Sequence, residues 1–147
     1  TIEMPYCNFK CDHECGKPVC QNGPLAHAPN INYSMDSIIE TYKINPIARA
    51  VCFQGLEPFD SIEDLRDFIF NFRICNSIND DIVIYTGYTE KEINSSPIKL
   101  GVYKYLKSHC SNIIIKFGRF VPNQEPHYDE VLGVKLASDN QYARRIS

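Results

Sequence analysis

Four of the seven cysteines of this chain lie between positions 7 and 20, in the segment CNFKCDHECGKPVC. A hydrophobic core uses an occasional cysteine as a small apolar side chain, but this segment is otherwise rich in charged residues. Clustered thiols in a polar loop indicate that the loop holds an iron–sulfur cluster, a zinc ion or a disulfide. We therefore expect residues 7–20 to form a binding loop and not part of the core.

Composition narrows the possible classes of protein. A chain of 147 residues predicts one domain over 1–147, with enough length to bury a core. The net charge of -3 gives no basic surface, so direct nucleic-acid binding is not expected. The sequence has no apolar run long enough to cross a membrane and no signal-peptide pattern, which predicts a cytoplasmic protein. Cys52, Cys75 and Cys110 lie singly, and this distribution favours a reducing compartment over a disulfide scaffold.

Short apolar runs alternate with helical patterns along the rest of the chain. Strands are predicted at the N-terminus and at 50–53, 82–85 and 112–116. Helices are predicted from a Ser34 cap, from Asp60, and within 89–93 and 100–107. Unbroken β-branched strands between helices predict an α/β fold with a mostly parallel sheet. Ligands of such folds bind at the carboxyl ends of the strands, where the cysteine loop, the QGLEP segment and the TGYT segment all fall.

Five segments, in order, resemble those of one enzyme family. CNFKC at 7–11 resembles the start of the CxxxCxxC cluster motif of radical S-adenosylmethionine (SAM) enzymes. The other four resemble elements of the small proteins that activate anaerobic ribonucleotide reductase: GLEP at 55–58 (GGEP in the family), IYTGY at 84–88, GRF at 118–120 and ASDNQ at 137–141. The resemblance spans nearly the whole chain. It implies a compact partial (β/α) barrel of about five or six mostly parallel strands.

The resemblance implies a [4Fe–4S] cluster held by three cysteines. Cys7 and Cys11 match the first two ligands, but Glu14 stands where the third is usual. Spacing favours Cys15 as the third ligand, whereas the Gln-Asn pair that follows Cys20 favours Cys20, so both stay open. A fourth thiolate would block the iron at which SAM binds, and one of the two is therefore expected to lie off the cluster.

The resemblance also gives cofactor-binding roles to six residues, which are Phe9, Gly55, Glu57, Thr86, Tyr88 and Asn140. Phe9 would pack near the cluster, and Gly55 and Glu57 would lie at the amino group of SAM. The sequence departs from the family at two nearby positions: Leu56 replaces the second glycine of GGEP, and Phe117 replaces the aspartate that precedes GRF.

The activity that the resemblance implies is radical generation. An electron from the cluster would cleave SAM to methionine and a 5′-deoxyadenosyl radical, which would take a hydrogen atom from a glycine of a large partner enzyme. The implied partners are this glycyl radical enzyme and a reductant of the flavodoxin or ferredoxin type. Two alternatives remain. One is a radical SAM enzyme for a small molecule such as a deazapurine precursor, and the other is a non-catalytic module in which the four cysteines and His13 bind zinc.

Overall fold

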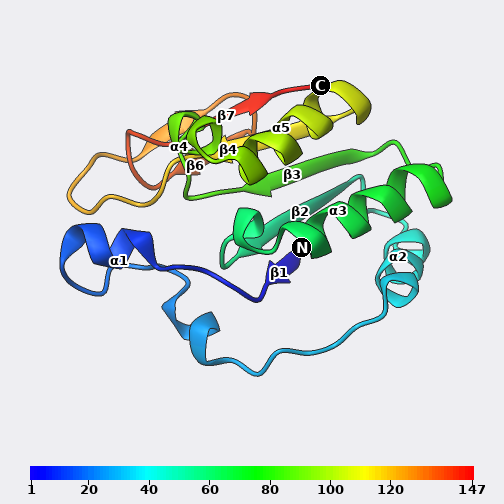
Figure 1. Cartoon of the computed structure of the whole chain (residues 1–147), viewed down its shortest axis with the longest axis horizontal. Helices are drawn as coiled ribbons and strands as arrows, with labels where there is room; N and C mark the ends of the chain where they lie inside the picture. The colour runs from blue at the N-terminus through cyan, green and yellow to red at the C-terminus, as the bar shows by residue number, and fades with distance from the viewer.

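The computed structural model describes residues 1–147, whose main feature is a five-stranded sheet with the order β1-β2-β3-β4-β7 (Figure 1). Four strands run parallel, and these are β1 (Ile2–Met4), β2 (Ala50–Gly55), β3 (Asp81–Tyr85) and β4 (Ile113–Phe117). The last strand, β7 (Tyr142–Arg145), pairs antiparallel with β4 at one edge. The prediction of an α/β fold with a mostly parallel sheet is thus confirmed.

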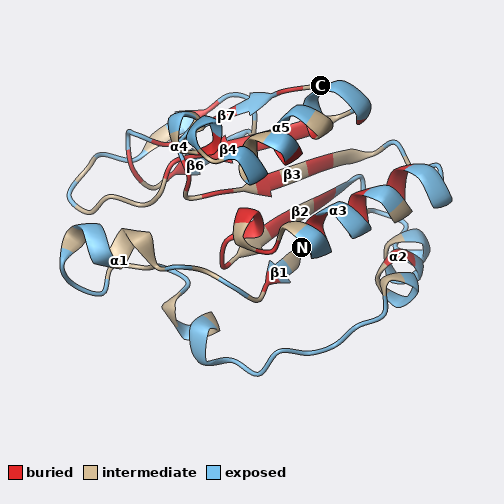
Figure 2. Cartoon of the chain, viewed as in Figure 1, coloured by how far each residue is buried: buried red, intermediate tan, exposed pale blue.

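The helices connect successive strands and cover one face of this sheet. They are α2 (Met35–Ile44), α3 (Ile62–Phe70) with the π-helical turn η3 (Asn71–Cys75), α4 (Glu90–Ser95) and α5 (Pro97–His109). Strands β1 to β4 lie side by side in the sheet in the same order as in the sequence. Right-handed crossovers between them therefore place these connecting helices on the same face of the sheet. The core lies between them, and Figure 2 shows its buried residues on the strands and on the inner sides of α3 and α5. None of the helices combines the length and the hydrophobicity that crossing a bilayer requires.

The start of one helix follows the prediction and the start of another differs. The Ser34 hydroxyl accepts a hydrogen bond from an amide in the first turn of α2, as an N-cap does. Helix α3 begins at Ile62, two residues later than predicted, because the 3₁₀ turn η2 (Pro58–Asp60) occupies the preceding residues. The Glu57 carboxylate caps that turn by accepting a hydrogen bond from the Phe59 amide at 3.0 Å.

Several short elements were not predicted. The cysteine loop contains α1 (Lys10–Cys15), which buries no residue, and the 3₁₀ turn η1 (Gly23–His27) follows it. From there the chain runs to α2 through exposed residues that cross outside the body of the molecule (Figure 1). Near the C-terminus, β5 (His127–Asp129) and β6 (Val134–Leu136) form a separate antiparallel hairpin.

The face of the sheet opposite the helices carries a row of polar side chains near the carboxyl ends of the strands. Phe53 of β2 pairs with Ile84 of β3, and both belong to the core beneath the helices. Side chains alternate along a strand, so the next residues, Gln54 and Tyr85, point to the opposite face. Lys116 of β4 pairs with Tyr85 and extends the same row.

Candidate functional site

A cavity of about 340 Å³ lies at the carboxyl ends of the four parallel strands, where the row of polar side chains ends. It is lined by residues from all three segments that the sequence singled out, namely Cys7, Cys11, Cys20, Gly55, Leu56, Glu57, Thr86 and Gly87. Residues 134–137 of β6 and the following turn form another part of the wall. The parallel topology thus brings together segments that are far apart in the sequence.

Three of the four clustered cysteines line this cavity. They are Cys7, Cys11 and Cys20, whereas Cys15, the last residue of α1, is not part of the wall. All seven cysteines are free thiols, and no three His, Cys, Asp or Glu side chains are gathered around one point as ligands of a single ion. A cluster binds each cysteine through a different iron atom, so its thiolates need not converge on one point.

Local backbone geometry brings Cys20 to Cys11. Phe9 has a φ of 51° and turns the chain into α1, and Gly16 ends the helix with a φ of 64°. The Asp12 carboxylate then accepts hydrogen bonds from the amides of Val19 and Cys20, both at 2.8 Å. These bonds fold the end of the loop back over its beginning. Cys20 is consequently near enough to raise the pKa of the Cys11 thiol.

The thiols lie in surroundings that disfavour the thiolate form. Burial raises the pKa of Cys7 to about 11 and that of Cys11 to about 12. The Phe9 amide donates a hydrogen bond to the Cys7 sulfur at 3.2 Å, which offsets part of this effect. Thiols of this kind remain protonated at neutral pH until a positive charge compensates for burial. Iron supplies such a charge and displaces the thiol protons. Three thiols on one cavity are also the donors that an iron–sulfur cluster takes, so the residues fit this group.

Glu57 is a buried carboxylate with an unused acceptor site on the cavity. Its side chain accepts hydrogen bonds from the Thr86 hydroxyl at 2.7 Å and the Gly87 amide at 2.8 Å, in addition to Phe59. Burial raises its pKa to about 7 in spite of these donors. No cation is among its hydrogen-bond donors, and Oε2 accepts only one of the three bonds. Glu57 can therefore accept a further hydrogen bond from a positively charged ligand group.

Lys116 is a cavity residue that the sequence analysis missed. It is 7 % exposed, and its ammonium donates a hydrogen bond to the Gly118 carbonyl at 2.6 Å. Burial lowers its pKa to about 8, although the negative charge of Glu57 acts in the opposite direction. The sequence did contain a signal for this residue, because Lys116 directly follows three isoleucines in a predicted buried strand. Burying a charge is costly, so a lysine at such a position indicates a function.

Two more of the predicted SAM residues have a defined place on the wall. Gly55 has a φ of 82°, and a side chain there would meet the Glu3 backbone at 3.2 Å, so this position requires glycine. Thr86 is buried and orients Glu57. Leu56 is also buried at the cavity and its φ is not positive, so the backbone accommodates a side chain at this position.

The other three predicted cofactor residues, Phe9, Tyr88 and Asn140, do not line the cavity. Tyr88 donates a hydrogen bond to Asp60 at 2.7 Å and accepts one from Asn8 at 2.8 Å, which joins the cysteine loop to η2. The Asn140 amide donates to the Arg119 carbonyl at 3.0 Å. In this structure these two side chains therefore hold neighbouring segments of the chain together.

Comparison with known proteins bears on what the cavity holds. A family model described as "4Fe-4S single cluster domain" matches residues 2–141, which include the four clustered cysteines and the other cavity segments. No curated protein and no solved structure matches the chain. The match supports a [4Fe–4S] cluster among the three possible occupants of the loop. The chain therefore belongs to the family of 4Fe–4S single cluster domains.

Proposed function

We propose that this chain is a radical SAM enzyme whose [4Fe–4S] cluster is bound by Cys7, Cys11 and Cys20. The observation that carries the proposal is that these three thiols share one cavity with Glu57, whereas Cys15 does not line it. Three thiolates leave one iron free of protein ligands, and SAM would bind there. When bound and reduced, the cluster would supply the electron that cleaves SAM to methionine and a 5′-deoxyadenosyl radical.

Charges in the cavity suit the amino acid end of SAM. That end carries an ammonium and a carboxylate, and the cavity presents Glu57 and Lys116 with the opposite charges. Glu57 would accept a hydrogen bond from the ammonium, and Lys116 would pair with the carboxylate. The donors from Thr86 and Gly87 hold the Glu57 carboxylate in one orientation before the ligand arrives. Both side chains would therefore act by orienting SAM.

The substrate that we propose is a segment of a large glycyl radical enzyme. A cluster and SAM would fill much of a cavity of about 340 Å³, which leaves little room for a second small molecule. The sheet has free edges at β1 and β7, which is compatible with a partial barrel that opens toward a partner. A reductant of the flavodoxin or ferredoxin type would supply the electron, and the seven free thiols suit a reducing cytoplasm.

The test is anaerobic reconstitution followed by two assays on the same protein. We expect about four irons per chain and the release of 5′-deoxyadenosine from added SAM after reduction with dithionite. Cys7→Ala, Cys11→Ala and Cys20→Ala should each lose the cluster and the cleavage activity. Cys15→Ala is the matched control and should keep both.

Two results would change this proposal. A Cys15→Ala protein without a cluster, together with a Cys20→Ala protein that keeps one, would move the third ligand to Cys15. A wild-type protein with a full cluster that leaves SAM intact would refute the radical SAM activity.

A further inference from the structure

We propose that Glu92 and Arg119 are positioning residues that fix the cysteine loop against the sheet through an ionic clamp. The clamp consists of Lys10 and Glu14 on α1, Glu92 on α4 and Arg119 after β4. The inference rests on the proposed function in one respect, because Cys7, Cys11 and Cys20 are taken as the cluster ligands. What it adds is the device that holds the middle of their loop in place.

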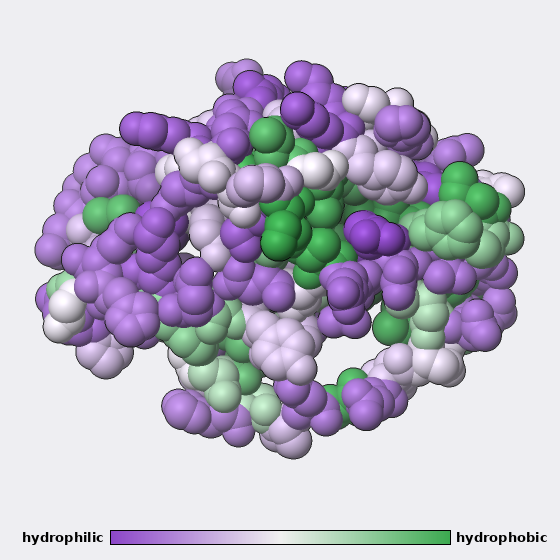
Figure 3. Space-filling model, in the orientation of Figure 1, coloured by the Kyte–Doolittle hydropathy of each residue, from purple (hydrophilic) through white to green (hydrophobic).

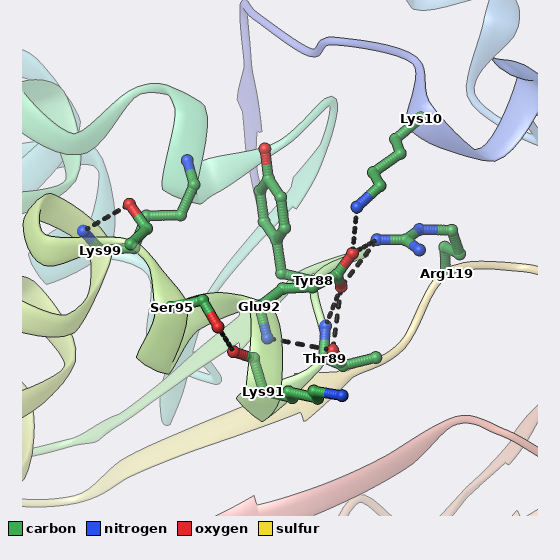
Figure 4. Close-up of a pocket in the computed structure, with 9 residues that line it drawn as sticks. Lys10, Tyr88, Thr89, Lys91, Glu92, Ser95, Lys99 and Arg119 are labelled. Carbon is green, nitrogen blue, oxygen red and sulfur yellow. Dashed lines mark hydrogen bonds and ion pairs between the residues drawn. The ribbon is translucent and has the colours of Figure 1, made fainter. Parts of the chain in front are cut away.

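The geometry of the clamp centres on Arg119. One guanidinium nitrogen donates to both Glu14 oxygens at 3.0 and 2.8 Å, and the other donates to both Glu92 oxygens at 2.7 and 2.8 Å. Lys10 also pairs with Glu92, and Figure 4 shows Lys10 and Arg119 reaching that carboxylate from two directions. Two cations thus balance two anions across three segments of the chain.

The loop has little else to hold its middle. Helix α1 buries no residue, and Figure 3 shows mostly hydrophilic residues over this end of the molecule. Asn8 and Asn22 hydrogen-bond to the body at the two ends of the loop. Between them, Lys10 and Glu14 make the only side-chain hydrogen bonds and ion pairs that reach beyond the loop. Polar contacts therefore replace apolar packing in positioning Cys11.

Glu92 is held in place independently of the loop. Its carboxylate accepts hydrogen bonds from the amide and the hydroxyl of Thr89, which form a capping box at the start of α4. Partial burial alone would raise the pKa of Glu92, but the donors from Arg119, Lys10 and Thr89 outweigh it and lower the pKa to about 2. The carboxylate consequently stays charged, and the clamp is a constant restraint at physiological pH.

An open depression of about 540 Å³ lies beside the clamp and has cations along its wall. Four cations line it, which are Lys10, Lys91, Lys99 and Arg119. Three of them already pair with a carboxylate, since Lys99 contacts Asp60 and the other two contact Glu92. In Figure 4, Lys91 and Lys99 also point away from the centre of the clamp. The charges therefore favour a structural network over a ligand site.

The test compares Glu92→Gln with Glu90→Gln on the same helix. Glutamine also serves in a capping box, so Glu92→Gln removes the charge and keeps the start of α4. Glu90 pairs with Arg144 of β7 and not with the loop, which makes its variant the matched control. In the metal-free proteins, hydrogen exchange of residues 10–20 should accelerate about tenfold in Glu92→Gln and remain at the wild-type rate in Glu90→Gln.

Two further measurements separate positioning of the loop from general destabilisation. In reconstituted proteins, chelator-driven iron release should be faster in Glu92→Gln, and added salt should accelerate release from the wild type more than from this variant. Arg119→Gln should also release iron faster than the wild type. Arg119→Lys should reverse only part of this acceleration, because lysine lacks the planar guanidinium that bridges two carboxylates.

Exchange of residues 10–20 at the wild-type rate in Glu92→Gln would overturn the clamp, as would equal acceleration in both helix α4 variants. The exchange experiment needs no cluster. A wild-type chain that takes up no iron would therefore refute the proposed function. The hydrogen-exchange rates of the metal-free variants would still test the clamp.

Discussion

Two buried side chains of the cavity, Glu57 and Lys116, carry charges that their surroundings disfavour. Glu57 is 6 % exposed and its pKa rises to about 7, while the pKa of Lys116 falls to about 8. Burial is the largest cause of both shifts, and neither residue forms an ion pair with a close partner. Groups retained at such a cost are typical of binding sites, where a ligand supplies the missing charge.

Replacing Lys116 should therefore make the protein more stable and less functional. In Lys116→Met we expect the free energy of unfolding to rise by about 1 kcal/mol or more at pH 7, because the desolvated ammonium is removed. SAM binding should weaken about tenfold or more through loss of a charge-assisted hydrogen bond.

The pH dependence of this stability gain has a definite sign. A lysine whose pKa drops from 10.5 to about 8 on folding binds fewer protons in the folded state between these values. Wild-type stability should then rise with pH from about 8 to 10.5, and the advantage of Lys116→Met should shrink over the same interval. Urea unfolding of the metal-free proteins at several pH values measures both effects. A variant less stable than the wild type at pH 7 would contradict this explanation.

The sequence identified some of these residues better than others. The spacing and the following residues singled out the cysteines, but the choice between Cys15 and Cys20 depends on where the loop folds back. That fold depends on two amide hydrogen bonds to Asp12, which no spacing rule describes. Lys116 was visible in the sequence as a charge in an apolar strand, yet its burial follows from the pairing of β4 with both neighbours.

At the scale of elements, the turn after β4 connects the cavity with the clamp. Gly118 has a φ of 89°, and a side chain added there would lie 2.9 Å from the Asn140 carbonyl oxygen. Its neighbour Arg119 lines the cavity and also holds α1. The close approach of this turn to the C-terminal segment explains why the structure requires glycine immediately before the arginine.

Two alanine substitutions should have opposite effects for this reason. Gly118→Ala forces a side chain into left-handed backbone against a carbonyl oxygen, and we expect it to destabilise the fold by about 1–3 kcal/mol. Gly101→Ala lies in α5 with no atom within 4 Å of the added carbon, and it should stabilise by about 0.5–1 kcal/mol. The midpoints of urea unfolding measure both effects. Equal shifts in the two variants would show that backbone conformation does not control the turn.

Elements with a strong apolar pattern were predicted and those without one were missed. Strands β2, β3 and β4 each contain a continuous apolar run, and α5 has a buried face made by Val102, Tyr103 and Leu106. Helix α1 buries nothing, so its sequence has no periodicity to detect. Strands β5 and β6 have three residues each, which is too short for alternation to be significant.

At the scale of the whole molecule, the parallel sheet converts sequence order into spatial proximity. The four parallel strands have their carboxyl ends along a single edge of the sheet. The segments that follow these ends carry the thiols, the Glu57 carboxylate and Thr86. The sequence predicted this convergence from the strand pattern alone. It did not predict the hairpin of β5 and β6, whose second strand forms part of the cavity wall from a distant part of the chain.

The measurement that tests the central claim most directly is electron paramagnetic resonance of the reduced, reconstituted protein with and without SAM. We expect the signal of a reduced [4Fe–4S] cluster, changed in shape when SAM binds the iron that lacks a cysteine. Cys15→Ala should give the same change. A wild-type cluster signal that SAM leaves unaltered would contradict the account, because the cavity would then hold a cluster without an open iron.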